Sequence, residues 1–148
     1  KGVARRYETV GYFDGCRIIS DYAHHPSEIK AVISTAKKEN ERVIAIFEPH
    51  TYSRTASLLK EFAGAFSSAD TVIILPTYSA RETPSDGVNS ERLFCELEHK
   101  EKYFISSYEQ CVTLIKNLAK DNGIVLLLGA GSIDCMRDML VKNANSDY

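Results

Sequence analysis

The sequence predicts an α/β fold: a three-layer α/β/α sandwich around a mostly parallel six-stranded sheet with one antiparallel strand. Apolar runs of strand length alternate along the chain with segments of helical periodicity, as in βαβ units. The runs at 43–47, 71–75 and 124–128 are apolar on both faces, which is typical of central parallel strands that helices cover on each side. A turn signal near the N-terminus adds the antiparallel strand.

Local turn and helix signals predict the first elements. Asp14 and Gly15 lie between two apolar stretches and favour a type I′ turn, so the first two strands form a hairpin. Pro26 suits the first turn of a helix, because no N–H is needed there. Apolar residues then recur at helical spacing and predict a helix over residues 27–39: Ile29, Val32, Ile33 and Ala36.

The rest of the chain continues this alternation. Asn89 or Ser90 would cap one helix at its start, and Gly123 would close another as a C-cap. The long polar segment 77–89 favours a binding loop or a mobile flap. The other elements are helices at 58–66, 90–99 and 111–119, a strand at 103–105, and a last helix after residue 132.

Composition and charge exclude several classes of protein. Apolar residues make up 44% and charged residues 26% of the 148 residues, and the net charge is −2; such values are ordinary for a globular domain. No basic surplus points to nucleic acid as a partner, and no apolar run approaches the ~20 residues that cross a bilayer. Since residues 1–6 do not resemble a secretory signal, we expect one cytoplasmic domain over residues 1–148.

The four cysteines indicate neither disulfides nor a metal site. Their gaps are long and irregular, whereas a zinc site needs closer ligand pairs. We expect reduced, mostly buried thiols at Cys16, Cys95, Cys111 and Cys135.

Polar residues gather where the predicted parallel strands end. In open α/β sheets, ligands bind beyond the carboxyl ends of the strands, and loops on a rigid sheet often carry function. Here those ends are the segments 20–25, 48–54, 76–82 and 129–132.

The densest polar cluster contains Asp21, Tyr22, His24 and His25. A carboxylate there can accept hydrogen bonds from a sugar hydroxyl or orient a cation. An imidazole can bind an anion, ligate a metal or carry a proton. The alternative is that Asp21 or a neighbour only caps the next helix, with the histidines exposed.

A second cluster follows the next strand and contains His50 and Arg54. A guanidinium can hold a carboxylate or phosphate at two points, and both residues could face the same crevice as His24. The alternative is a surface arginine and a turn histidine. We expect no metal site built from His24, His25 and His50, because adjacent histidines rarely reach one ion and no further ligand has suitable spacing.

The glycine turn at 129–131 could present backbone N–H groups to an anion, or it could be only a tight connection between strand and helix. Ser132 follows it and begins the last helix. The sequence contains no phosphate-binding loop of the G-x-x-x-x-G-K-[ST] type. This chain therefore cannot hold ATP phosphates in the usual way.

Five short motifs occur in the same order as in a known family. They are Arg-Arg-Tyr-Glu at 5–8, Asp-Tyr-Ala-His-His-Pro at 21–26, Phe-Glu-Pro-His-Thr-Tyr-Ser-Arg-Thr at 47–55, Ser-Ala-Arg-Glu at 79–82 and Gly-Ala-Gly at 129–131. With these motifs, the chain resembles the C-terminal domain of the Mur ligases over almost its whole length. The third motif favours the member that adds L-alanine to UDP-N-acetylmuramate; the related murein peptide ligase is the alternative within the family.

The resemblance implies the third domain of a three-domain ligase of peptidoglycan precursor synthesis. In that family the first domain binds the UDP-sugar, and the second binds ATP and Mg²⁺. The muramate carboxylate is phosphorylated to an acyl phosphate, the amino group of L-alanine attacks it, and phosphate and ADP are released. The implied partners are thus UDP-N-acetylmuramate, L-alanine and ATP, and this chain alone would be inactive.

The resemblance also implies roles for individual residues. Carried over by position, Arg6 and Asp21 would contact the nucleotide, with Asp21 accepting hydrogen bonds from ribose hydroxyls. The remaining roles concern the amino acid and the acyl phosphate. Tyr22 and the catalytic His24 would line that region, and the catalytic His50 would lie with Arg54 near the alanine carboxylate.

Two positions depart from the family pattern. Thr51 stands where many relatives have arginine, so one possible contact to the alanine carboxylate is missing or supplied elsewhere. Glu48 stands where glutamine is common. The main alternative outside the family is a stand-alone nucleotide- or anion-binding module without catalysis. The two interpretations differ in whether the candidate residues converge on one open face.

Overall fold

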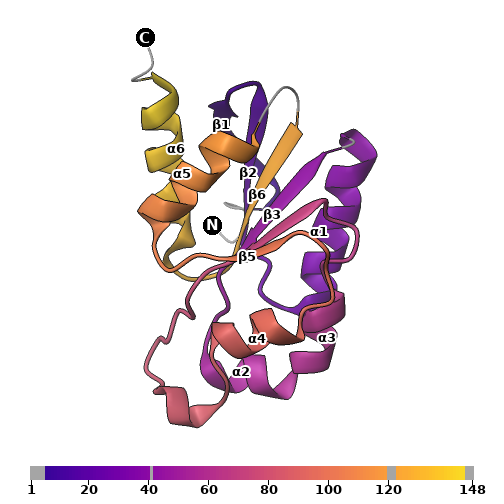
Figure 1. Ribbon diagram of the computed structural model, residues 1–148, viewed down its shortest axis with the longest axis vertical. Coiled ribbons are helices and arrows are strands. Elements are labelled where there is room, and N and C mark those ends of the chain that lie inside the picture. Colours follow the sequence, from indigo (N-terminus) through magenta and orange to yellow (C-terminus); the bar gives the residue numbers. More distant parts are fainter. Residues whose placement is uncertain (1–5, 41, 120–122, 146–148) are drawn as a thin grey trace.

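The computed structural model describes residues 6–40, 42–119 and 123–145 and confirms the three-layer α/β/α architecture (Figure 1). The sheet has the strand order β1-β2-β6-β3-β4-β5. Only β1 and β2 pair in antiparallel fashion; the other neighbours are parallel. The strands are β1 (Glu8–Phe13), β2 (Cys16–Asp21), β3 (Val43–Phe47), β4 (Thr71–Ile74), β5 (Lys102–Phe104) and β6 (Gly123–Leu128).

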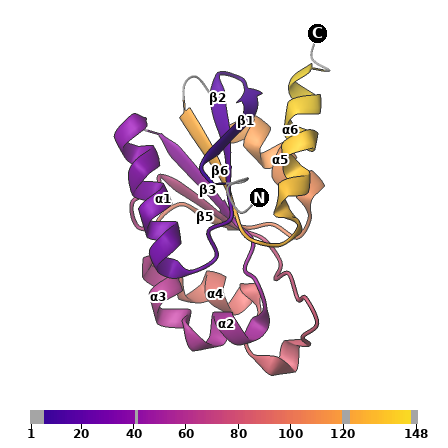
Figure 2. The same cartoon turned by 180° about the vertical axis from the view of Figure 1, so that it is seen from behind.

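Helices cover both faces of the sheet (Figures 1 and 2). One face packs against α1, α3 and α4, and the other against α5 and α6. The helices are α1 (Pro26–Glu39), α2 (Tyr52–Ser57), α3 (Leu59–Gly64), α4 (Ser90–Glu96), α5 (Tyr108–Leu118) and α6 (Cys135–Asn145). Two 3-10 turns complete the described chain, η1 (Pro84–Asp86) and η2 (Ser132–Asp134).

The central strand β3 is buried on both faces because its side chains alternate between the two cores. Val43, Ala45 and Phe47 join the core under α1 and α3, whereas Ile44 and Ile46 join the core under α5 and α6. This explains why the sequence shows a continuous apolar run instead of an alternating one.

The hairpin prediction is confirmed. Asp14 and Gly15 have φ angles of 53° and 83°, the positive values that a type I′ turn requires at both central positions. Pro26 also stands in the first turn of α1, as expected.

Several local predictions were wrong. The helix expected at 58–66 begins earlier, at Tyr52, and breaks into α2 and α3 at Leu58, whose φ and ψ are −119° and 23°. Gly123 does not cap α5; it is the first residue of β6. The helix expected to reach residue 99 ends at Glu96.

Only two of the four thiols are buried, whereas the sequence predicted that most would be. Cys16 and Cys111 are buried, whereas Cys95 and Cys135 are exposed. All four are free.

The register of the parallel strands places the predicted functional segments at one edge. Asp21 at the end of β2 pairs with Leu128 of β6, Leu128 pairs with Phe47 of β3, and Phe47 pairs with Ile74 of β4. These four strands therefore end level with one another. The loops that follow them begin side by side, as the sequence predicted.

We expect Phe47→Ala to lower the free energy of unfolding by about 3–5 kcal/mol. Phe47 is fully buried, and its ring centroid lies 5.5 Å from that of Phe62 and 5.4 Å from that of Phe66, so truncation leaves a cavity. Tyr12→Ala, at a residue that is 60% exposed, should change it by no more than about 0.5 kcal/mol. Urea unfolding measures both; equal losses would contradict this description of the core.

Candidate functional site

The His50 ring lies at the centre of the polar groups beyond β3. It stacks on Tyr78 with 5.4 Å between centroids and 20° between planes. Arg54 in α2 places Nη1 3.3 Å from His50 Nδ1. Since a guanidinium only donates, Nδ1 accepts, and the neutral ring carries its proton on Nε2. Burial and the positive charges of Arg54 and His24 lower the pKa of His50 and outweigh the opposite effect of Glu82.

His24 reaches the same place from the loop after β2. Its ring centroid lies 6.1 Å from that of His50. Its Nδ1 lies 2.9 Å from the carbonyl oxygen of Tyr22, which only accepts, so Nδ1 carries the proton in this contact. In these contacts the two rings offer opposite functions when both are neutral: Nε2–H of His50 can donate, and Nε2 of His24 can accept.

The neighbouring His25 has a structural role. Its Nδ1 accepts from the N–H of Ser27 at 3.3 Å and caps α1. Glu28 completes the cap, since its Oε1 accepts from the N–H groups of His24 and His25, both at 3.2 Å. The alternative prediction, a helix cap with an exposed histidine, is thus correct for His25. It does not describe His24.

Asp21 lies below this surface and is only 4% exposed. Its Oδ2 accepts from the N–H of Tyr7 and its Oδ1 from the N–H of Ala23, both at 2.8 Å. The carboxylate thereby fixes the chain entering β1 to the loop after β2. Each carboxylate oxygen can accept a second hydrogen bond, so Asp21 keeps acceptor capacity, and its contact with ribose stays a prediction.

Arg6 and Tyr22 are exposed at the same edge. Burial acts to raise the pKa of Glu28, but the N–H groups donated by His24 and His25 and the charges of His24 and Arg6 lower it overall. Arg5, the partner of Arg6 in the first motif, lies outside the described residues.

Thr51, which departs from the arginine of the family pattern, has a structural role. Its Oγ1 accepts from the N–H of Arg54 at 3.4 Å and caps α2. Its φ of 66° is unfavourable for a β-branched residue. The surroundings therefore hold this conformation, and Thr51 adds no cation to the site.

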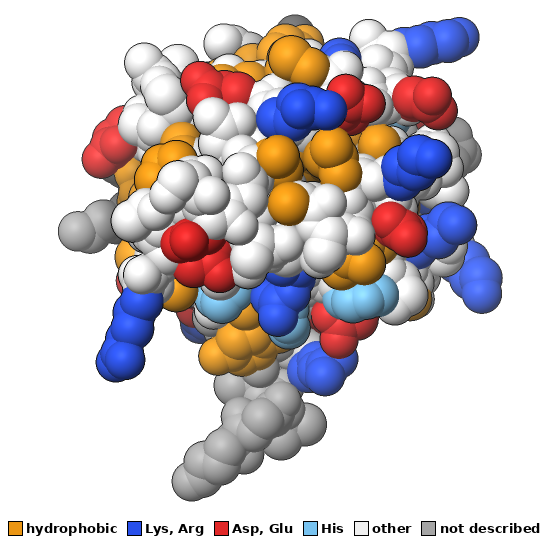
Figure 3. All heavy atoms as spheres, turned by 90° about the horizontal axis from the view of Figure 1, so that it is seen from below, with side chains coloured by type: hydrophobic (Ala, Val, Ile, Leu, Met, Phe, Trp, Pro, Cys, Tyr) orange, Lys and Arg blue, Asp and Glu red, His pale blue; other side chains and the backbone are white. Residues whose placement is uncertain are grey.

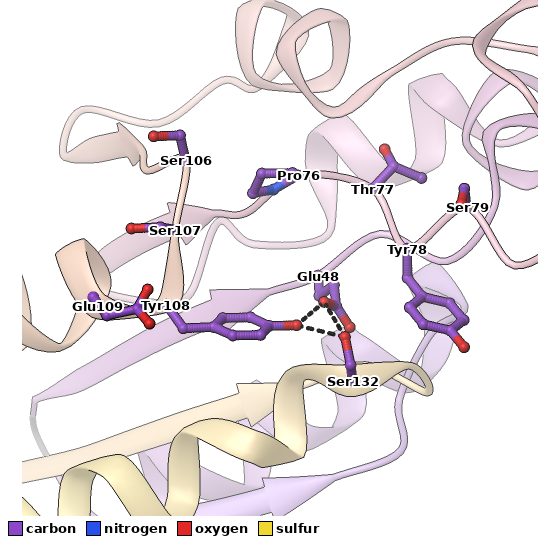
Figure 4. Close-up of a pocket in the computed structure, with 10 residues that line it drawn as sticks. All are labelled: Glu48, Pro76, Thr77, Tyr78, Ser79, Ser106, Ser107, Tyr108, Glu109 and Ser132. Atoms are coloured by element: carbon purple, nitrogen blue, oxygen red, sulfur yellow. Dashed lines mark hydrogen bonds between the residues drawn. The ribbon is translucent and has the colours of Figure 1, made fainter.

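A buried carboxyl network lies beneath the site (Figure 4). Glu48 is 3% exposed and accepts hydrogen bonds from the hydroxyl of Tyr108, from Ser132 Oγ at 3.3 Å and from the N–H of Ile133 at 3.0 Å. Burial raises the pKa of Glu48, although these hydrogen bonds oppose the shift. The network joins β3 to α5 and to the turn after β6.

A pocket of about 400 Å³ opens above Glu48. Figure 4 shows Tyr108 and Tyr78 on opposite sides of it, with the Tyr108 hydroxyl directed at Glu48. Hydroxyl groups and two tyrosine rings dominate its lining: Tyr78, Ser79, Ser106, Ser107, Tyr108 and Ser132. Gly131 packs against this wall so closely that a Cβ would lie 2.5 Å from Tyr78 Cγ. The turn therefore has no room for a side chain at Gly131, and anion binding by its N–H groups stays a prediction.

The structure brings His24, His50 and Arg54 together as the sequence predicted. Figure 3 shows histidine side chains beside cationic and acidic ones on the face seen from below. Sequence reasoning missed the stacking of Tyr78 on His50 and the bond between Tyr108 and Glu48. A carboxylate directly after a fully apolar strand was the one available signal for the latter.

Neither a cluster of metal ligands nor a membrane-spanning helix occurs among the described residues. No group of three or more His, Cys, Asp or Glu side chains in residues 6–40, 42–119 and 123–145 is placed to hold a metal ion. Within the same ranges, no helix has the length and apolar character that crossing a bilayer requires.

Known proteins resemble this chain closely in sequence. The sequence profile of the Mur ligase, glutamate ligase domain, matches residues 5–131. A UDP-N-acetylmuramate–L-alanine ligase from Caldicellulosiruptor bescii is 42% identical over 147 residues, covering 97% of this chain and 32% of the relative. The same ligase from Brucella anthropi is 43% identical over 136 residues, covering 89% and 29%. The chain thus spans about a third of the length of these relatives.

Solved structures show the same fold. A UDP-N-acetylmuramate–alanine ligase from Thermotoga maritima has a TM-score of 0.77 and 27% identity, covering 97% of this chain and 30% of that one. A domain assigned to a UDP-N-acetylmuramate:L-alanyl-gamma-D-glutamyl-diaminopimelate ligase from Haemophilus ducreyi has a TM-score of 0.71 and 22% identity. The match covers 94% of this chain and 99% of that one, so a domain of this size has been crystallised on its own.

We expect Glu48→Gln to become more stable relative to the wild type as pH rises. Because burial raises the pKa of Glu48 in the folded state, folding favours the protonated acid. That contribution is complete below the ordinary pKa of about 4.3 and is lost as pH rises through the folded pKa. Glutamine does not ionise, and its oxygen can accept from Ile133.

Urea unfolding measures the free energy of unfolding of both proteins at intervals between about pH 4 and pH 8, a range that extends upward from the ordinary glutamate pKa. The free energy of unfolding of Glu48→Gln minus that of the wild type should increase and then level off. A difference independent of pH would contradict a raised pKa of Glu48 in the folded protein.

Proposed function

The chain belongs to the Mur ligase family, and we propose that it is the C-terminal domain of an ATP-dependent ligase that joins L-alanine to UDP-N-acetylmuramate. The observation that carries the proposal is the meeting of His24, His50 and Arg54 at one edge of the sheet. The names of relatives that are 40–43% identical support the choice of substrates.

Arg54 would bind the carboxylate of L-alanine. It is half-buried, and one nitrogen of its guanidinium is already oriented by His50 Nδ1. A charge-assisted hydrogen bond of this kind contributes about 1.5–3 kcal/mol. Because Thr51 supplies a helix cap instead of a second cation, Arg54 would be the principal carboxylate ligand from α2.

The two histidines would act on either side of the reacting groups. Nε2 of His24 can accept a proton or hydrogen bond from the alanine amine, which must be neutral to attack the acyl phosphate. Nε2–H of His50 can donate to an oxygen of the acyl phosphate as charge develops there. The lowered pKa of His50 keeps its ring neutral and so preserves its contact with Arg54.

Arg6 and Asp21 would contribute to the nucleotide site. Arg6 is an exposed cation, suited to phosphate, and Asp21 keeps acceptor capacity for ribose hydroxyls. When bound, ATP supplies the phosphoryl group that activates the muramate carboxylate. The described residues contain no cluster of metal ligands, and Mg²⁺ would be held mainly by another part of the ligase. The complete ligase would work in the cytoplasm.

The exposure of the candidate residues supports half of a shared site better than a closed binding module. Tyr22 and Tyr78 are both 38% exposed, and Arg6 is exposed as well. No described segment covers them on the side away from the sheet. The chain spans about a third of its relatives, and the missing half would come from the other two thirds.

A chimera tests this proposal. Residues 1–148 would replace the C-terminal third of the Caldicellulosiruptor bescii relative, with the unmodified relative and a version lacking that third as controls. Phosphate release should require ATP, UDP-N-acetylmuramate and L-alanine together, and the 148-residue chain alone should release none. Turnover by the isolated chain, or release by the chimera that does not depend on L-alanine, would refute the assignment.

In the same chimera, we expect Arg54→Ala to raise the KM for L-alanine by about 10- to 100-fold, the loss of one charge-assisted hydrogen bond. The KM for ATP should change much less. Arg92→Ala is a matched control, because Arg92 is an exposed arginine on α4 that pairs with Glu96 at 3.3 Å. A similar rise in both KM values for Arg54→Ala would place Arg54 outside the amino-acid site.

A further inference from the structure

The long segment after β4 is fastened to the turn that carries His50. The N–H of Thr51 donates to the Tyr78 carbonyl, and the N–H of Tyr78 donates to the Pro49 carbonyl, both at 2.8 Å. This short parallel bridge lies beside the stacked His50 and Tyr78 rings. The segment expected to be a binding loop or a mobile flap is therefore tied to the site at its first residues.

A second attachment lies at the start of α2. Glu82 Oε1 accepts from the N–H groups of Tyr52 and Ser53 at 2.8 and 2.9 Å, and Oε2 accepts from the Ser53 hydroxyl. Farther along, the N–H of Val88 donates to the Tyr52 carbonyl at 3.2 Å. At Gly87, a Cβ would lie only 2.0 Å from that carbonyl oxygen, so the segment passes α2 in direct contact.

These contacts hold a strained piece of backbone. Thr51 keeps a positive φ only if its neighbours hold it there, and they are Tyr78 on one side and the clamped Tyr52 and Ser53 on the other. Thr51 Oγ1 in turn accepts from the N–H of Arg54 and so caps α2. The direction in which α2 leaves β3, and with it the place of Arg54, depends on this arrangement.

Glu82 also acts on the site through its charge. The hydrogen bonds from Ser53 are the main cause of the lowered pKa of Glu82, and the charge of Arg54 contributes. Glu82 in turn raises the pKa of His50, against the larger effect of burial. The carboxylate is thus within electrostatic reach of both candidate groups.

We propose that Glu82 is a positioning residue: its carboxylate fastens the start of α2 to the 77–89 segment and so sets His50 and Arg54 for the amino-acid carboxylate. Glu82 acts on them through the N–H groups of Tyr52 and Ser53 and through its charge, as a positioning residue and not as a substrate ligand. The substrate part of this inference depends on the proposed function. The positioning part depends only on this chain.

Two substitutions separate the hydrogen bonds from the charge. Glu82→Ala removes both, whereas Glu82→Gln keeps an oxygen that can accept from Tyr52 and Ser53. Asp86→Ala is the matched control in the same segment, because the hydrogen bond that Asp86 Oδ2 accepts from the N–H of Thr83 at 2.8 Å lies within the segment.

Amide hydrogen exchange and NMR of the 148-residue chain test the positioning directly. In Glu82→Ala, the amides of Tyr52 and Ser53 should exchange about five- to tenfold faster, as expected for a lost helix cap. The ring signals of His50 and the guanidinium signals of Arg54 should shift with them. Glu82→Gln should restore the wild-type exchange within about threefold, and Asp86→Ala should affect Thr83 but neither amide of α2.

Kinetics of the chimera add the functional test. Glu82→Ala should raise the KM for L-alanine several-fold with little change in the KM for ATP, and Glu82→Gln should largely restore it. If the amides of Tyr52 and Ser53 exchange faster while His50 and Arg54 keep their signals, Glu82 is only a cap and the positioning role is refuted. An inactive wild-type chimera would contradict the proposed ligase and leave the NMR result to decide the positioning.

Discussion

The level ending of four parallel strands is the constraint on which the rest of this structure depends. The pairs Asp21–Leu128, Phe47–Leu128 and Phe47–Ile74 place the last residues of β2, β6, β3 and β4 in one row. Of the candidate groups, Asp21 belongs to this row and Arg6 precedes β1. The others, Tyr22, His24, His50 and Arg54, lie in the segments that follow β2 and β3. Apolar side chains that alternate between two cores hold the register, because a slip of one residue would exchange those cores.

Charge is distributed over this edge in a consistent way. The cation of Arg54 and two imidazoles lie at the surface, whereas the acids are placed below or beside them. Asp21 and Glu48 are buried and accept hydrogen bonds from backbone and hydroxyl donors. Glu82 is bound to the start of α2. The surface thus keeps its cationic groups for an anionic ligand, and the carboxylates stabilise the loops that present them.

The sequence was informative where the signal is local. The Asp14–Gly15 turn, the helix begun at Pro26 and the double-faced strands all follow from short patterns, and strand order in the chain was enough to bring His24, His50 and Arg54 to one edge. Contacts between distant segments left no such pattern. Tyr108 lies 60 residues from Glu48, and nothing near either residue indicates the other. The apolar stripe that predicted the second helix begins at Leu58, so it did not indicate the separate helix α2 that precedes this residue.

The stacking of Tyr78 on His50 brings the loops after β3 and β4 together, and the contact between Arg54 and His50 beside it offers the most direct test of this account. NMR titration of the His50 ring in the 148-residue chain measures it. The pKa of His50 should lie below its ordinary value of 6.5 because of burial and the nearby positive charges, and it should rise when Arg54 is replaced by alanine. An ordinary pKa that is unaffected by this replacement would contradict the proposed arrangement of the site.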